Sequence, residues 1–88
     1  MAGVKVEYKA SVAGDLDRPG PPIAHRVLTK IEKALASGGS AGERLSGEFA
    51  GLFRLRVGDY RVIYARTTEG HLVLRIGHRG EAYRKGRA

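Results

Sequence analysis

Four short stretches of the chain are predicted to be β-strands, and apolar and polar residues alternate along the first two of them, which is the pattern of half-buried strands. The stretches are residues 4–8, 53–57, 60–66 and 72–76. Gly58 and Asp59 separate the second stretch from the third, and two residues with glycine first are typical of a tight hairpin turn. Residues 67–70 (Thr-Thr-Glu-Gly) predict another turn. The C-terminal half is therefore predicted to be an antiparallel meander of three strands.

Two helices are predicted between the first strand and this meander. Apolar residues recur at helical spacing on one face of the second helix: Ile23, Val27, Leu28, Ile31 and Leu35. Ser11 is the expected N-cap of a shorter helix over residues 12–18. Residues 19–22 (Pro-Gly-Pro-Pro) separate the helices, and the Gly- and Ser-rich residues 37–42 end the second one. We expect one small α+β domain over residues 1–88: an N-terminal strand, a helical hairpin and the meander.

The hairpin turn determines which side chains share a face of the sheet. In a two-residue loop Val57 opposes Tyr60, so Arg56 opposes Arg61. One face then carries Phe53, Leu55, Val57, Tyr60, Val62 and Tyr64. The other carries Arg54, Arg56, Arg61, Ile63 and Ala65. A slip of one residue would move arginines into the core, so the pattern specifies this register.

The arginines on the second face are unfavourable for the sheet by itself. Directly opposed like charges destabilise a sheet by about 0.2–1 kcal/mol per pair. An anion bound among Arg54, Arg56 and Arg61 would remove that cost, whereas protection of the sheet edge by scattered positive charge is the alternative.

The net charge agrees with an anionic partner. The 88 residues carry +7, and residues 44–88 hold ten basic and four acidic side chains, nine of the ten being arginine. Arginine binds phosphate through two parallel hydrogen bonds, so nucleic acid is the simplest partner. A basic surface that only maintains solubility remains the alternative.

Other chemistries lack the residues they need. The chain has no cysteine, and its three histidines show no metal-ligand spacing, so we expect no metal and no small-molecule cofactor. His25 is expected to be solvated and His71 to lie at the turn before the last strand. His78 follows that strand beside the arginines and could exchange protons near neutral pH, although a surface histidine without a role is the alternative. No apolar run is long enough to span a membrane, so we expect a cytoplasmic protein with no membrane partner.

One long motif resembles a known superfamily. It is Leu45–Tyr64 (LSGEFAGLFRLRVGDYRVIY), followed by LVLRIGHR at 72–79 and by Tyr83 and Arg84. These residues strongly resemble the RelE/ParE superfamily, the toxins of bacterial and archaeal type II toxin–antitoxin systems. The resemblance covers nearly the whole chain. It implies a RelE-like fold, with a sheet like that of the microbial RNases packed on helices.

The RelE branch consists of ribosome-dependent endonucleases that cut messenger RNA at codons in the ribosomal A site. The 2′-hydroxyl attacks the adjacent phosphate without a metal. The resemblance places Arg54, Arg56 and Arg61 at the basic catalytic positions, with Arg79 on the arginine after the last strand and Tyr83 on the tyrosine that stacks on the substrate base. Two residues are missing between Arg79 and Tyr83 relative to that pattern.

The general base is the main departure from the RelE pattern. The best-studied RelE members carry lysines where Arg54 and Arg56 stand, and arginine does not lose its proton. We therefore assign part of the base's role to His78, or to Glu48 if its loop folds over the site.

Two other functions remain open. ParE-type members inhibit DNA gyrase by protein contact and generally lack the nuclease residues. The third hypothesis is a basic RNA-binding module without turnover. Either toxin implies a cognate antitoxin, with an acidic or amphipathic segment that covers the basic face or displaces the C-terminal segment. The nuclease reading adds the ribosome and messenger RNA as partners.

Overall fold

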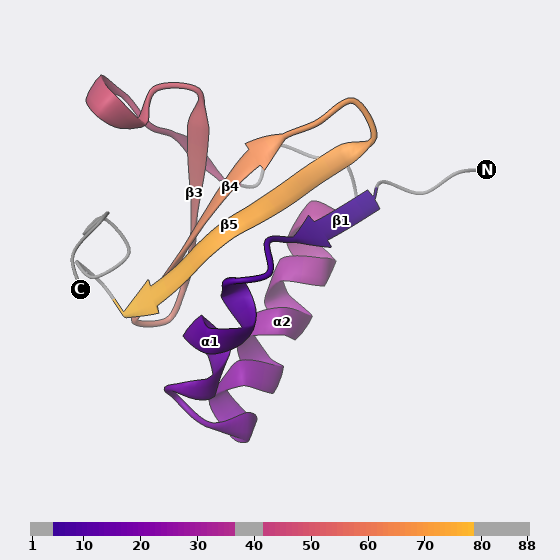
Figure 1. The fold of residues 1–88 in the computed structure, drawn as a ribbon, viewed down its shortest axis with the longest axis vertical. Coiled ribbons are helices and arrows are strands. Elements are labelled where there is room, and N and C mark those ends of the chain that lie inside the picture. Colours follow the sequence, from indigo (N-terminus) through magenta and orange to yellow (C-terminus); the bar gives the residue numbers. More distant parts are fainter. Residues whose placement is uncertain (1–4, 37–41, 79–88) are drawn as a thin grey trace.

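The computed structural model describes residues 5–36 and 42–78, which form one sheet with two α-helices on one of its sides (Figure 1). In chain order the elements are β1 (Lys5–Tyr8), α1 (Val12–Asp17), α2 (Pro21–Leu35), β2 (Glu43–Arg44), the 3₁₀ turn η1 (Gly47–Phe49), β3 (Leu52–Val57), β4 (Tyr60–Arg66) and β5 (Gly70–His78). The expected α+β order of strand, helical hairpin and three-stranded meander is confirmed. The expectations for residues 37–41 and for Arg79 and Tyr83 lie outside the described residues.

The sheet places the first and last strands of the described chain side by side. Its strand order is β1-β5-β4-β3-β2, and β1 pairs with β5 in parallel whereas all other pairs are antiparallel. The parallel pair starts at Lys5 and Gly70. A Cβ atom on Gly70 would overlap the backbone carbonyl oxygen of Lys5, so glycine permits this close approach.

The β3–β4 hairpin has the predicted register. Val57 pairs with Tyr60, Arg56 with Arg61 and Arg54 with Ile63. Gly58 has a φ of 61°, and no described residue other than glycine has a positive φ. A positive φ at the first turn residue alone is typical of a type II′ turn, which matches the twist of the two strands.

The core lies between the helices and one face of the sheet. Val12 of α1 and three residues of α2 (Val27, Ile31 and Leu35) pack against Val57, Val62, Tyr64, Val73 and Ile76. Tyr8 ties β1 to α2, because its hydroxyl donates a 2.7 Å hydrogen bond to Oε2 of Glu32. Burial raises the pKa of Tyr8, and the hydrogen bond to Glu32 raises it further.

The break between the helices follows from the proline-rich segment. Helix α1 ends at Asp17, Gly20 has a φ of 90°, and Pro21 begins α2 at a position where its missing N–H is not needed. Ser11 occupies the N-cap position of α1, but its side chain makes no capping hydrogen bond. Among the described residues, no helix has the length and apolar character to cross a membrane.

The structure corrects the last strand and adds two elements. Strand β5 runs from Gly70 to His78 rather than over residues 72–76, because pairing with β1 continues to its first residue. His71 is therefore not in a turn: it lies within the strand with 4% of its surface exposed. The short strand β2 and the turn η1 were not predicted.

Candidate nucleic-acid interface

Among the described residues, one face of the sheet carries four arginines and no α-helix. We call it the arginine face and define it by Arg54, Arg56, Arg61 and Arg75. Arg56 and Arg61 are cross-strand partners, and Ile63 lies between Arg54 on one side and Arg75 on the other. Because side chains alternate along a strand, all four arginines point away from the helices. The structure thus brings together the three described arginines that the sequence predicted, and it adds Arg75.

Arg56 and Arg61 form the most unfavourable pair on this face. The pair beside a two-residue turn exchanges hydrogen bonds, so the next pair is of the closely spaced kind, with Cα atoms about 4.5 Å apart. Nη1 of Arg61 reaches the carbonyl oxygens of Gly58 and Tyr60 at 3.4 Å, at the long end of the hydrogen-bond range. Gly77, the partner of Arg61 on β5, has no side chain to crowd it. The register thus places two arginines directly opposite each other on one face, an arrangement that suits a bound anion.

Arg54 has an acidic partner that sequence reasoning missed. Glu43 of β2 pairs with it across the strands, and the guanidinium donates a hydrogen bond to the carboxylate. This hydrogen bond and the charge of Arg54 lower the pKa of Glu43, and Arg56 adds to the effect. Glu43 is therefore ionised at neutral pH and holds the Arg54 guanidinium. Strand β2 has two residues and shows no periodic pattern, so the sequence carried no signal for it.

A bulge in β5 shapes the neighbouring surface. Ile63 pairs with Arg75, but the next residue of β4, Tyr64, pairs with Val73, so Leu74 is an extra residue in β5. Leu74 and Arg75 both line a pocket of about 230 Å³, together with Ile63. Glu48 of η1 lines the same pocket, so the loop that carries it does lie over this side of the sheet.

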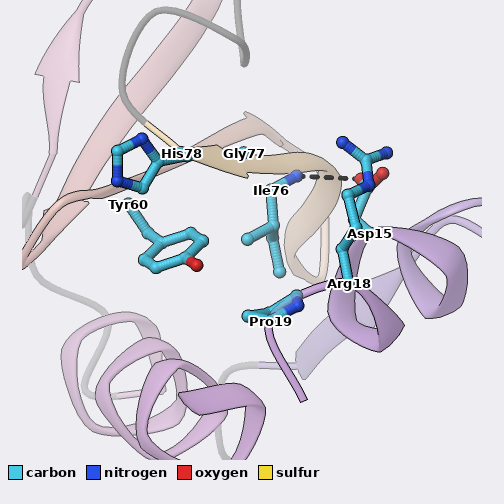
Figure 2. A pocket seen from close by; sticks show the side chains of 7 residues that line it. All are labelled: Asp15, Arg18, Pro19, Tyr60, Ile76, Gly77 and His78. Atoms are coloured by element: carbon cyan, nitrogen blue, oxygen red, sulfur yellow. Dashed lines mark hydrogen bonds between the residues drawn. The ribbon is translucent and has the colours of Figure 1, made fainter.

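His78 lies on the other side of the sheet. It pairs with Tyr60, and the two rings meet edge to face with centroids 5.3 Å apart. Both residues line a pocket of about 210 Å³ between β5 and α1 (Figure 2). There the carboxylate of Asp15 accepts a 3.0 Å hydrogen bond from the backbone N–H of Ile76. The structure therefore does not bring His78 together with the arginines.

The remaining histidines are not part of the arginine face. His25 is exposed on α2, as expected. The His71 ring packs edge to face on Tyr64 at 5.2 Å, on the helix side of the sheet, and its Nδ1 is buried without a hydrogen-bond partner. Burial lowers the pKa of His71, and nearby Arg66 lowers it further. In the part of the chain that the structure describes, no three acidic or histidine side chains are grouped to hold a metal ion.

The arrangement of the arginine face can stabilise negative charge. Guanidinium groups remain protonated at all working pH values, so the face offers fixed hydrogen-bond donors to phosphate oxygens. Such donors stabilise charge that builds up on a phosphate during reaction. Glu43 and Glu48 are carboxylates at the edges of this face, beside Arg54 and Arg75 respectively.

The family comparison decides the identity at the level of the superfamily. Residues 6–83 match the model of the ParE toxin of the type II toxin–antitoxin system parDE. The chain belongs to the ParE toxin family. It is thus a type II toxin of the RelE/ParE superfamily. No curated protein sequence matches the chain.

Solved structures, two of them toxin–antitoxin complexes, share the fold. The RelBE2 toxin–antitoxin complex of Mycobacterium tuberculosis includes a chain with 26% identity and a TM-score of 0.72, over 89% of this chain and 100% of that one. The RelB–RelE complex of Methanococcus jannaschii gives 16% identity and a TM-score of 0.62, over 88% and 94% of the two chains. YafQ of Escherichia coli gives 15% identity and a TM-score of 0.62, over 91% of this chain and 98% of that one.

Proposed function

We propose that this toxin cleaves messenger RNA in the ribosomal A site and that the arginine face holds the scissile phosphate. The observation that carries the proposal is the pairing of Arg56 with Arg61 next to Arg54, on the sheet face opposite α1 and α2. These are the basic positions that the resemblance to RelE assigned to catalysis. Similarity to the RelBE2 toxin complex supports the same branch.

In the proposed reaction the 2′-hydroxyl of the RNA attacks the adjacent phosphorus. The bond from O2′ to phosphorus forms, the bond from phosphorus to O5′ breaks, and the products are a 2′,3′-cyclic phosphate and a 5′-hydroxyl. Arg56 and Arg61 bind the non-bridging oxygens and stabilise the extra charge of the five-coordinate phosphorus. Arg54, held by Glu43, adds a third donor.

The 2′-hydroxyl proton needs an acceptor and the 5′-oxygen needs a donor. Arginine is a poor acceptor, and Glu43 and Glu48 are the carboxylates that border the arginine face. The participation of His78 stays a prediction from the sequence, with its ring placed beside Tyr60. The roles of Arg79 and Tyr83 also stay predictions.

The test is primer extension on messenger RNA in a translating bacterial extract with purified toxin. We expect ribosome-dependent cuts within A-site codons, and a loss of about 100-fold or more in cleavage rate for Arg61→Ala. Arg26→Ala removes the same charge from the exposed surface of α2 and should keep the rate. Intact message with normal translation would refute the nuclease function, and tight RNA binding without any cut would favour a non-catalytic RNA-binding module.

A gyrase inhibitor is the second candidate, because the matching family model is that of the ParE toxin. The assay is supercoiling of relaxed plasmid by purified DNA gyrase. Inhibition that survives Arg61→Ala, together with intact message in the extract, would support the gyrase inhibitor and remove the nuclease.

A cognate antitoxin is the proposed partner of either toxin. The similar RelBE2 and RelB–RelE structures are toxin–antitoxin complexes. The net charge of +7 favours an antitoxin segment that is acidic. The affinity of such a segment should fall steeply with added salt, which isothermal titration at two ionic strengths would measure.

A further inference from the structure

The arginine face has an apolar pocket beside its charged groups. Ile63 forms its floor and is only 3% exposed, although neither α1 nor α2 covers this face. Leu52 and Leu74 continue the apolar surface, and Phe49 of η1 forms a wall. Buried apolar surface in the middle of a strongly basic face is not needed for solubility or for edge protection.

Two features of the backbone create this pocket. The bulge in β5 turns two consecutive residues, Leu74 and Arg75, toward the same pocket, where a regular strand would turn them to opposite faces. The η1 turn then brings Phe49 over the sheet ahead of β3. Bulges re-aim side chains in this way beside functional sites.

The charges around the pocket indicate what fits it. Lys9 and Arg75 lie at its border, and Ile63, its floor, has Arg54 as a direct cross-strand neighbour. A ligand with a flat apolar body and a phosphate attached to it would bury the body on Ile63 and Leu74 and leave the phosphate among arginines. An unpaired nucleobase in a single strand has this shape and charge, and bases stack on aromatic and apolar side chains.

Glu48 supplies a means of choosing among bases. It is exposed and lines the pocket together with Lys9 and Arg75. A carboxylate accepts hydrogen bonds from the exocyclic amino group of cytosine or adenine, and uracil has no such group.

We infer that this pocket binds one unpaired base of the messenger RNA, next to the phosphate held by the arginine face, with Phe49 as its stacking wall and Glu48 as its selector. The inference rests on the proposed nuclease function and adds a base subsite to it. An apolar side chain of an antitoxin is the competing occupant.

The test is single-turnover cleavage on ribosomes programmed with messages that carry one abasic nucleotide at a chosen position of, or beside, the A-site codon. An abasic nucleotide removes one base and keeps every phosphate. At one position we expect the wild-type rate to fall by about tenfold or more, the size of one lost base–aromatic contact. Phe49→Ala should lower the rate on the intact message similarly and lose sensitivity to that abasic site.

Two further variants sharpen the result. Glu48→Gln, an exposed and nearly isosteric change, should lower the ratio between the cleavage rates on cytosine and uracil messages at the same position. A role of Glu48 in proton transfer alone would slow both messages and leave this ratio unchanged. Arg61→Ala should slow all messages and keep the ratio between intact and abasic ones, because it acts on the phosphate.

The failures can be told apart. In the first case the wild type cleaves, but every abasic message slows the wild type and Phe49→Ala by the same factor. This result would refute the base subsite and leave the nuclease function standing. The same holds if Phe49→Ala weakens only antitoxin binding. If the wild type cleaves no message, the nuclease function fails and the subsite with it.

Discussion

Strands β3, β4 and β5 contribute side chains to both faces of the sheet, but the two faces have different roles. On β4, Val62 and Tyr64 point toward the helices and are 0% and 1% exposed, while Arg61 between the turn and Val62 points the other way. Burial of apolar side chains on the helix-covered face stabilises the folded protein, whereas the opposed like charges on the arginine face destabilise it. Because side chains alternate along a strand, one residue can stabilise the fold while the next one binds a ligand. Substitutions on the two faces should therefore have separable effects on stability and on cleavage.

The largest loss of stability is expected on the helix-covered face. Ile31→Ala removes a side chain that is 0% exposed and leaves a cavity under the sheet, which should lower the free energy of unfolding by about 3 kcal/mol. Urea denaturation would measure it. Arg61→Ala, on the opposite face, should change stability by less than about 1 kcal/mol. Similar losses of stability in both variants would contradict the difference between the two faces.

A smaller loss is expected where α1 meets the sheet. Asp15→Ala removes the acceptor of the Ile76 N–H, and we expect a loss of about 1.5 kcal/mol from the unsatisfied donor. Asp17→Ala, an exposed position on the same helix, is the matched control. Thermal unfolding of both variants would measure the difference, and equal melting temperatures would contradict the role of this hydrogen bond.

His71, on the helix-covered face, is expected to make the stability of the folded protein depend on pH. Its pKa is lower in the folded protein than in the unfolded chain, so the unfolded chain binds more protons below the ordinary histidine value near 6.5. Stability should therefore be complete above about pH 7 and fall as the pH drops through that value. His71→Leu should flatten the decline measured by urea denaturation between pH 7 and pH 5. His25→Leu should leave it unchanged, and an equally steep decline in His71→Leu would exclude this histidine as the cause.

The smallest effect is expected on the arginine face, and it has the opposite sign. Arg56→Glu replaces two opposed like charges with an ion pair to Arg61, so we expect a gain in stability of about 0.5 kcal/mol together with loss of cleavage. The gain should disappear in the double variant with Arg61→Ala. Chemical denaturation at low salt would measure it, and a net loss of stability would mean that the arginines do not repel each other.

Local patterns predicted one part of this fold well. The register of β3 and β4 follows from the two residues Gly58 and Asp59, because a two-residue turn allows one pairing. The opposition of Arg56 and Arg61, and with it the candidate site, could therefore be predicted from sequence alone.

Features that depend on distant parts of the chain could not be predicted in this way. Residues 72–76 are apolar except for Arg75, so their pattern does not assign each side chain to a face of the sheet. The bulge puts Val73 and Ile76 into the core and Leu74 with Arg75 on the other side. The burial of His71 depends on pairing with β1, and Glu43 meets Arg54 through a two-residue strand without periodicity. Sequence alone also could not place Phe49 in the same pocket as Ile63, because the two residues come from a turn and a strand that are separated along the chain.

The parallel pairing of β1 with β5 has a consequence for the order of folding. The first strand of the sheet can be added only after the last one is available, and closing a loop that spans most of the chain costs entropy before any contact repays it. The β3–β4 hairpin, by contrast, closes over two residues and can form early. During synthesis the pair Arg56 and Arg61 would therefore come together before the sheet that supports it is complete, and β1 would join last.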